Sequence, residues 1–379
     1  MASKEMYALG SQASVIRDLF AYGQQQAAVV GKENVFDFSI GNPTVPAPAC
    51  VKEAIEDIME TRESAAIHGY TAAVGDTAVR ADNFYMTCGA AASLTISLKA
   101  LVESSDDEII LIAPFFPEYT VFVQNANAKS VVLPPDTEHF QISLDALEKA
   151  ITPHTRAVII NSPNNPSGVV YSADTYEKLA ALLTRKSQEI GHAIYIISDE
   201  PYREIIYDGL PILYVPKFYK DTIICYSYSK SPSLPGERIG YVLVPDCAAD
   251  AKEVYTAVCG AGRSMGFVCA PHLFQDVVLK CLGQTSDMNI YDENRKLLYN
   301  GLKEMGYDCV YPSGAFYLFV KSPEADAKAF SDKAKKLNLL IVPADSFGCP
   351  GYVRVSYCVD PDMIKRSFAA FKKLMEQYQ

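Results

Sequence analysis

The chain has 379 residues, of which 34 are basic and 45 acidic, so its formal net charge is −11. Clustered Lys and Arg drive binding to nucleic acids and to anionic membranes, and the sequence has no basic run. The composition therefore argues against both kinds of partner. The length fits about two or three domains, and the apolar content of 49% is ordinary for a globular protein.

The beginning of the chain predicts a protein that is not exported. It lacks the basic segment followed by an apolar segment that forms a signal peptide. The most apolar short run, Ile109 to Phe116, is too short to cross a bilayer. Ten cysteines are scattered without a C-x-x-C pair, so we expect reduced thiols in the core. We therefore expect a cytoplasmic protein with no membrane contact.

The first elements in chain order are a helix, a strand and a turn. Residues 11–31 predict an amphipathic helix, which a short strand and the turn Gly41-Asn42-Pro43 follow. The strand-like run NFYMTC then leads through Cys88 and Gly89 into an apolar helix. Free N–H groups at the start of such a helix favour phosphate binding, so Gly89 would form the turn and the amides of Ala90 and Ala91 would donate. A simple strand-to-helix connection is the alternative interpretation.

The middle of the chain alternates continuous apolar runs with helix-patterned stretches. This alternation is typical of an α/β fold, whose largely parallel sheet is buried on both faces. Strands are expected at EIILIAP from Glu108, RAVIIN from Arg156, AIYIIS from Ala193, DTIICYSYS from Asp221 and IGYVLV from Ile239. Helices are expected from Leu144 and from Ser172.

The last hundred residues predict a second, smaller unit. From about residue 285 the sequence indicates a long charged helix, a strand pair near Val310 to Val320, another helix and the final strand YVRVSYC. We predict that residues 1–43 and 285–379 together form a small domain. Residues 44–284 are expected to form the large domain.

Polar side chains follow three of the expected strands. RAVIIN leads into an Asn-rich turn, AIYIIS into Asp199, and DTIICYSYS into Lys230. Ligands bind beyond the carboxyl ends of parallel strands, so we expect these groups to meet in one site. Hydroxyls and a guanidinium near Lys230 suit a phosphate, and neighbouring cations favour the neutral amine that imine formation requires. The alternative is a surface loop with a solvated lysine and an arginine in a salt bridge at its rim.

The segment from Ser227 to Gly240 resembles a known signature. S-x-S-K at Ser227 to Lys230, followed by Arg238 in G-x-R-x-G, is similar to class I/II aminotransferases of pyridoxal-phosphate fold type I. The resemblance covers nearly the whole chain. It implies a large domain with a mostly parallel, seven-stranded type of sheet flanked by helices, and pyridoxal 5'-phosphate as cofactor. Lys230 would hold the cofactor as an imine and move the substrate Cα proton, while Ser227, Ser229 and Arg238 would hold the phosphate.

The resemblance assigns roles to further residues of the cofactor site. Asp199 would keep the pyridine nitrogen protonated, which makes the ring an electron sink, and Tyr202 would hydrogen-bond the phenolic oxygen. In the match to N-P-[ST]-G, Asn165 would contact both the cofactor and the substrate carboxylate, with a cis bond to Pro166. Phe116 would stack on the ring, with Tyr119 nearby. Taken singly, each of these also suits a helix cap, a turn or the core.

The resemblance also implies a substrate-binding set and a partner subunit. Arg354 would bind the substrate α-carboxylate, and Gly41 and Asn42 would form the loop that closes over it. Tyr70, in His68-Gly69-Tyr70, would reach the phosphate of the second subunit, which implies a homodimer with shared active sites.

The chain departs from the family pattern at one junction. Between Arg80 and Ala81 most relatives carry a further segment that this sequence lacks. Either the chain has a deletion here or the sequence omits residues.

The predicted function is reversible transfer of an amino group between an amino acid and a 2-oxo acid by a ping-pong route. A β-eliminating lyase of the C–S lyase type is the main alternative, because it uses the same lysine and aspartate. A nucleotide-dependent oxidoreductase is disfavoured, since the glycines at 260, 262 and 266 do not fit G-x-G-x-x-G. A transcriptional sensor is disfavoured, because the residues before the large domain show no helix-turn-helix. No histidine spacing indicates a metal site. The sequence does not determine the side chain of the substrate. Arg263 is a candidate to bind an acidic side chain, and the Tyr and Phe residues near the early loop are candidates to bind an apolar one.

Overall fold

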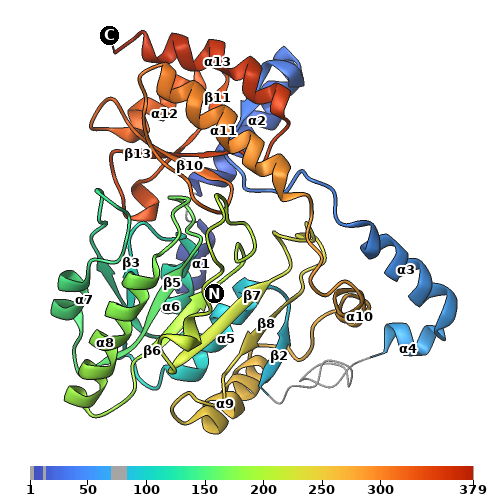
Figure 1. The fold of residues 1–379 in the computed structure, drawn as a ribbon, viewed down its shortest axis with the longest axis vertical. Coiled ribbons are helices and arrows are strands. Elements are labelled where there is room, and N and C mark those ends of the chain that lie inside the picture. The colour runs from blue at the N-terminus through green and yellow to red at the C-terminus, as the bar shows by residue number, and fades with distance from the viewer. Residues whose placement is uncertain (1–3, 12–13, 70–82, 379) are drawn as a thin grey trace.

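The computed structural model describes residues 4–11, 14–69 and 83–378. The predicted contact of Tyr70 and the junction between Arg80 and Ala81 lie outside these residues. The described chain forms a large lower body around one sheet and a smaller upper body around two smaller sheets (Figure 1).

The large sheet has seven strands in the order β2-β8-β7-β6-β5-β3-β4. Their bounds are β2 (Phe84–Thr87), β3 (Glu108–Ile112), β4 (Lys129–Leu133), β5 (Thr155–Asn161), β6 (Tyr195–Asp199), β7 (Thr222–Ser227) and β8 (Gly240–Leu243). The strands from β7 to β4 pair in parallel, whereas β8 runs antiparallel to both of its neighbours. The predicted mostly parallel sheet of an α/β fold is therefore confirmed.

Helices cover both faces of this sheet, which explains why its strands are apolar without interruption. Successive side chains of a strand point to opposite faces, so Ile109 and Leu111 join one core and Ile110 and Ile112 the other. The first core contains side chains of α5 (Ala90–Leu101), α6 (Glu118–Asn125) and α9 (Ala251–Ser264). The second contains side chains of α7 (Leu144–Ala150) and α8 (Ala173–Ile190).

The upper body combines both ends of the chain. Its four-stranded sheet has the order β12-β13-β10-β9, and the early strand β1 pairs in parallel with β11. Its strands are β1 (Phe36–Asp37), β9 (Asp308–Val310), β10 (Tyr317–Lys321), β11 (Leu339–Leu340), β12 (Val342–Pro343) and β13 (Tyr352–Ser356). Its helices are α2 (Val15–Val30), α11 (Met288–Glu304), α12 (Ala327–Lys335) and α13 (Pro361–Met375). The exact domain limits, 1–43 with 285–379 and 44–284, stay a prediction.

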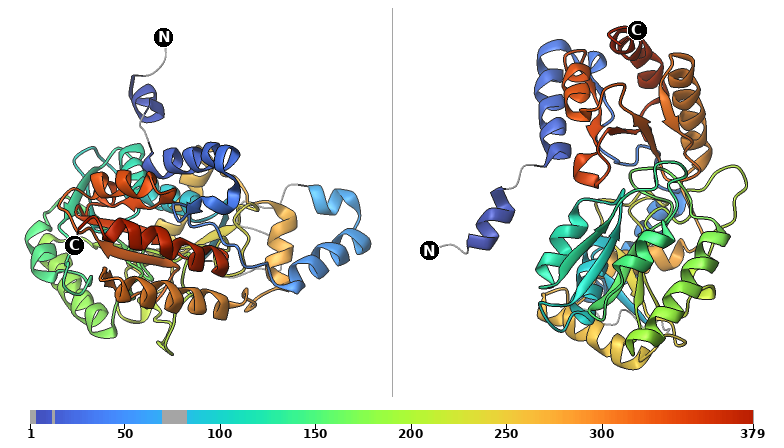
Figure 2. Two further views of the ribbon diagram at one scale, coloured as in Figure 1. Left: turned by 90° about the horizontal axis from the view of Figure 1, so that it is seen from above. Right: turned by 90° about the vertical axis from the view of Figure 1, so that its left-hand side faces the viewer.

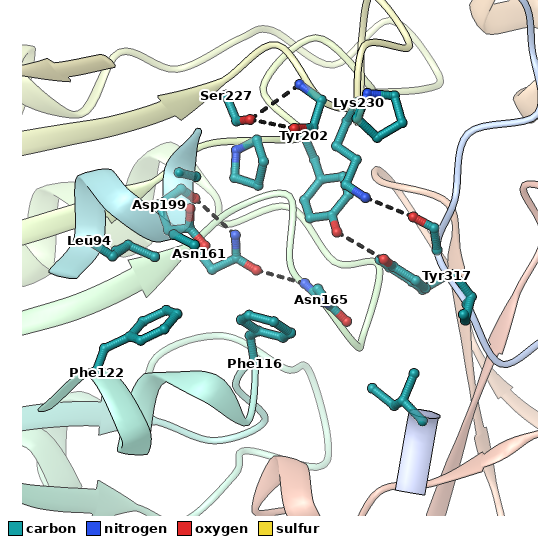
Figure 3. A pocket seen from close by; sticks show the side chains of 18 of the residues that line it. Leu94, Phe116, Phe122, Asn161, Asn165, Asp199, Tyr202, Ser227, Lys230 and Tyr317 are labelled. Atoms are coloured by element: carbon teal, nitrogen blue, oxygen red, sulfur yellow. Dashed lines mark hydrogen bonds between the residues drawn. The ribbon is translucent and has the colours of Figure 1, made fainter. Parts of the chain in front are cut away.

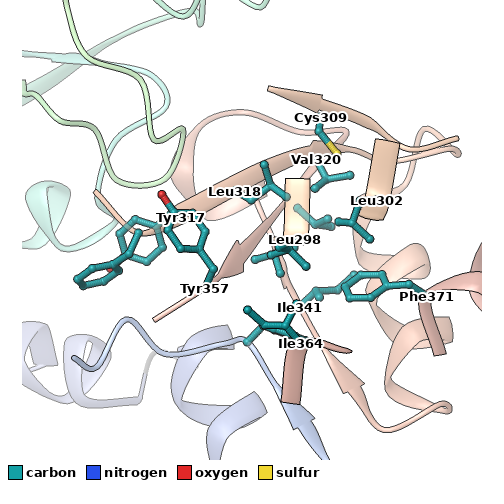
Figure 4. Packing of buried hydrophobic residues seen from close by; sticks show 14 of the residues in the cluster. Leu298, Leu302, Cys309, Tyr317, Leu318, Val320, Ile341, Tyr357, Ile364 and Phe371 are labelled. Atoms are coloured by element: carbon teal, nitrogen blue, oxygen red, sulfur yellow. The ribbon is translucent and has the colours of Figure 1, made fainter. Parts of the chain in front are cut away.

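The core of the upper body lies between its sheet and its helices. Leu298 and Leu302 of α11 pack there with Leu318 and Val320 of β10 (Figure 4). Phe371 of α13 joins the same cluster and is 1% exposed. This packing fixes β10 and β13, the two strands that carry side chains toward the lower body.

Helices outside the two cores lie at the periphery. α1 (Lys4–Ser11) stands away from the rest of the chain in both views of Figure 2. α3 (Ala49–Thr61) and α4 (Ser64–His68) project to one side, where α10 (His272–Lys280) contacts them. Short 3₁₀ helices lie at Lys32–Asn34, Val215–Lys217 and Asp345–Phe347. All ten cysteines are free thiols, and none of the helices in the described part of the chain is long and apolar enough to span a bilayer.

Candidate active site

A cavity of about 310 Å³ lies at the carboxyl ends of the central strands, between the large sheet and the upper body (Figure 3). Asn161, Asp199 and Ser227 are the last residues of β5, β6 and β7, and all three line it. Asn161 and Asp199 are also direct neighbours in the parallel ladder. The expected meeting of polar strand ends is thus what the sheet produces, because these strands stop at the same level.

Lys230 extends into the cavity from the loop that follows β7. Its Nζ donates a hydrogen bond of 2.7 Å to the backbone oxygen of Gly41, which comes from the N-terminal part of the chain. The amine lies 5.9 Å from the centre of the Tyr202 ring. Burial, helped by the positive charges of Arg354 and Arg238, lowers the pKa of Lys230 from 10.5 to about 8. About a tenth of this amine is therefore neutral, and hence nucleophilic, at pH 7, far more than for an ordinary lysine.

Asp199 presents one free carboxylate oxygen to the cavity. Its Oδ2 accepts a hydrogen bond of 2.5 Å from the Tyr119 hydroxyl, whereas its Oδ1 has no partner among the described residues. Burial raises the pKa of Asp199 to about 7, and the hydrogen bond from Tyr119 opposes this rise. A buried oxygen without a donor favours a ligand that brings a proton. A protonated ring nitrogen meets that requirement, so the carboxylate fits the cofactor that the resemblance implies.

The residues around Gly89 form a cup for an anion. Ser227 and Ser229 share a hydrogen bond of 2.7 Å between their hydroxyls, and Arg238 Nη1 lies 3.4 Å from the Ser229 hydroxyl. Ala90 and Ala91 begin α5 on the same wall. A Cβ on Gly89 would lie 2.8 Å from Arg238 Nη2, so only glycine leaves the cup open. Hydroxyls, a guanidinium and the start of a helix together are the donors that a phosphate prefers.

Arg354 closes the cavity from the side of the upper body. It is the middle residue of β13 and is 2% exposed. Its Nη1 donates to Asn165 Oδ1 at 2.9 Å, and its Nη2 donates to the backbone oxygen of Ser39 at 2.7 Å. The Nε has no partner among the described residues, so the guanidinium retains capacity for a planar anion such as a carboxylate. The peptide bond between Asn165 and Pro166 is cis, as predicted.

The structure brings most of the sequence-predicted site residues to this cavity. The predicted residues that line it are Gly41, Ala90, Ala91, Phe116, Asn165, Asp199, Tyr202, Ser227, Ser229, Lys230, Arg238 and Arg354. Gly89 lies directly behind the cup. Asn42 is exposed and does not line the cavity, and Tyr70 lies outside the described residues.

Several residues at the site were not predicted from the sequence. Tyr119 was noted only as a neighbour of Phe116, yet it is the donor to Asp199. The hydroxyl of Tyr317, from β10, lies 2.9 Å from that of Tyr202. Asn161 Nδ2 donates to the backbone oxygen of Asp199, and its Oδ1 accepts from the backbone N–H of Asn165. Asn161 had a signal, since it ends a predicted strand. The other two depend on contacts between segments distant in the sequence.

Residues 33–371 match the family described as aminotransferase class I and II. An aromatic-amino-acid aminotransferase 2 from Thermococcus litoralis is 28% identical over 390 aligned positions, which cover 96% of each chain. An aspartate aminotransferase from Thermotoga maritima is 30% identical, covering 88% of this chain and 89% of its own. Among solved structures, an aminotransferase from Eubacterium rectale is 57% identical with a TM-score of 0.98, covering 100% of this chain and 99% of its own. An aspartate aminotransferase from Thermus thermophilus with maleate has a TM-score of 0.86 at 22% identity, covering 99% of this chain and 100% of its own, which shows a shared fold.

Proposed function

Because the chain belongs to the class I and II aminotransferase family, we propose that it transfers amino groups between an amino acid and a 2-oxo acid with pyridoxal 5'-phosphate held at Lys230. The observation that carries this proposal is the cavity itself. It combines an amine with a depressed pKa, a carboxylate oxygen without a donor and an anion cup. Three separate stretches of the chain supply these groups.

The charged groups of the cavity divide the work. When bound, the cofactor supplies a protonated ring that withdraws electrons from the substrate Cα. Asp199 would keep the ring nitrogen protonated through its free Oδ1. Ser227, Ser229, Arg238 and the start of α5 would hold the phosphate. Phe116 would lie against one ring face, and Tyr202 would donate to the phenolic oxygen.

Lys230 would hold the cofactor at rest and act as the base afterwards. Its amine would take the proton from the substrate Cα and later return it, and a lysine with a pKa of about 8 suits both directions near neutral pH. Arg354 and Asn165 would orient the substrate through its α-carboxylate. Fixing the carboxylate sets the direction of the Cα–H bond relative to Lys230.

The attachment site is tested by borohydride reduction of the protein loaded with pyridoxal phosphate, followed by mass spectrometry of its peptides. We expect the reduced label on Lys230 and no label on the Lys230→Ala protein. Lys220→Ala is the matched control, because Lys220 is a solvent-exposed partner of Asp221 outside the cavity. Label retained by the Lys230→Ala protein contradicts the assignment. Asp199→Ala should still bind cofactor but lose most activity, and near-normal rates would remove its role at the ring nitrogen.

The reaction type is tested in a single half-reaction with an amino acid and no oxo acid. Transamination converts the cofactor to its amine form and releases one oxo acid per site. β-Elimination leaves the cofactor unchanged and releases pyruvate and ammonia continuously. The relatives reported above are all named aminotransferases, and none of these names supports elimination.

The proposed assembly is a homodimer, on the strength of the resemblance. Sedimentation of the purified protein tests it, and a monomer that retains full activity would contradict it. The cytoplasmic location expected from the sequence stays a prediction.

A further inference from the structure

We infer that the amino acid substrate carries a large apolar side chain, an inference that rests on the proposed function and adds the substrate class to it. Apart from tyrosines, the ionisable residues that line the described cavity are Asp199, Lys230, Arg238 and Arg354. Each of these has a task in binding the cofactor or the α-carboxylate. No charge of the described lining is left for a substrate side chain.

Apolar side chains make up much of the remaining wall. Ile16, Ile40, Leu94 and Phe122 line it beside Phe116, the residue assigned to the ring. Ile16, Ile40 and Phe122 are only partly buried by the chain itself, so they present apolar surface to the cavity. Figure 3 shows the rings of Phe116 and Phe122 on the wall away from Lys230. A substrate side chain that covers this surface removes it from water, which favours binding.

The helices that carry Ile16 and Phe122, α2 and α6, are linked by an ion pair. Arg17, next to Ile16 on α2, lies 3.7 Å from Glu118 of α6, the helix that also carries Phe122. Arg17 is adjacent in sequence to a lining residue, but its side chain is 81% exposed, is paired with Glu118 and does not line the cavity. A second carboxylate on the substrate would therefore meet isoleucine and phenylalanine. Burial of an unpaired charge against such groups disfavours binding.

The Arg263 alternative for an acidic substrate receives no support from this cavity. Arg263 lies in the last turn of α9, is exposed and does not line the cavity. In a homodimer a residue of the second subunit also has access to a shared site. The test therefore includes Arg263→Ala, so that this source of charge is measured rather than assumed.

The test uses unreactive carboxylates, so that its readout is binding and not turnover. Calorimetric titration of the protein loaded with pyridoxal phosphate would compare 3-phenylpropanoate, succinate and propanoate. We expect 3-phenylpropanoate to bind at least about tenfold more tightly than propanoate, as the burial of one large apolar group predicts. Succinate should bind no better than propanoate. Succinate binding more tightly than 3-phenylpropanoate overturns the inference and leaves the proposed function intact, whereas no binding of any of the three carboxylates contradicts the proposed function itself.

Variants locate the subsite. Phe122→Ala should weaken 3-phenylpropanoate binding by roughly tenfold and leave propanoate unchanged. Val121→Ala, on the same helix but outside the cavity lining, is the matched control and should change neither. Phe122→Leu is the second variant if Phe122→Ala does not fold, and it should give a smaller loss of the same kind. Equal losses for both ligands, or a loss of succinate binding in Arg263→Ala, would overturn the inference.

Discussion

Replacing Gly89 with alanine should weaken cofactor binding and destabilise the fold at the same time. Gly89 has φ 90° and ψ 172°, a backbone conformation that is essentially restricted to glycine. A side chain there costs about 1–3 kcal/mol of folding free energy. The added Cβ would also lie 2.8 Å from Arg238 Nη2 and 3.6 Å from the Ser227 hydroxyl. Arg238 must then move away from the cup, and the loss of one hydrogen bond to a charged group corresponds to about 1.5–3 kcal/mol, or roughly 10- to 100-fold in Kd.

Two measurements on the same preparations test this prediction. Denaturant unfolding of the cofactor-free protein measures the backbone cost, and fluorescence titration measures the Kd for pyridoxal phosphate. Gly191→Ala is the matched control. Gly191 ends α8 with φ 85° and ψ 11°, and an added Cβ would meet no atom within 4 Å. The control should lose about 1–2 kcal/mol of stability and keep its cofactor affinity. An unchanged Kd in Gly89→Ala would refute the role given to the cup.

Three further outcomes follow from the site. The rate of cofactor attachment should rise roughly tenfold between pH 7 and pH 9, because an amine with a pKa of about 8 loses its proton in this range. Stopped-flow measurements test this. A rate that keeps rising in proportion to hydroxide up to pH 10 would show that Lys230 has no depressed pKa. Tyr119→Phe removes a hydrogen bond that lowers the pKa of Asp199, so the acid limb of the kcat/KM profile should move to higher pH. An unmoved limb would show that Tyr119 does not influence the pKa of Asp199. In Arg354→Lys the lysine cannot reproduce the planar two-point contact of the guanidinium. The KM of amino acid substrates should therefore rise by roughly 10- to 100-fold while cofactor affinity stays constant. A normal KM would contradict the role of Arg354 in carboxylate binding.

The sequence predicted the central strands of the large sheet because a strand buried on both faces consists mainly of apolar residues. β3, β5, β6 and β7 are covered on both faces, so each appears as an unbroken apolar run. β4 has no continuous apolar run. Its residues Lys129 and Ser130 are exposed at the edge of the sheet, and the run KSVVL has a mixed pattern. The strand order, including the antiparallel β8, depends on pairing between distant segments and is not encoded in any local pattern.

The residues of the candidate site also fall into those that a local pattern predicts and those that only contacts between distant segments define. Residues at the ends of predicted strands, such as Asp199 and the lysine that follows β7, were found because the strand rule gives their position. Tyr119 and Tyr317 were not found, since each acts through one contact with a residue far away in the chain. The exposed position of Asn42 shows the limit of motif transfer. A motif identifies a loop, but the path of that loop decides which of its residues faces the cavity.

The proposed cofactor ligands and Arg354, one of the two proposed ligands of the substrate carboxylate, belong to different sheets. Asp199, Ser227 and Lys230 are on or directly after strands of the large sheet, whereas Arg354 and Tyr317 are on the four-stranded sheet. A small rotation of one sheet against the other would leave the grip on the cofactor unchanged and would alter only the space for the incoming amino acid. Such a rotation would open and close the space for the reactants, and the prosthetic group would stay in place from one turnover to the next.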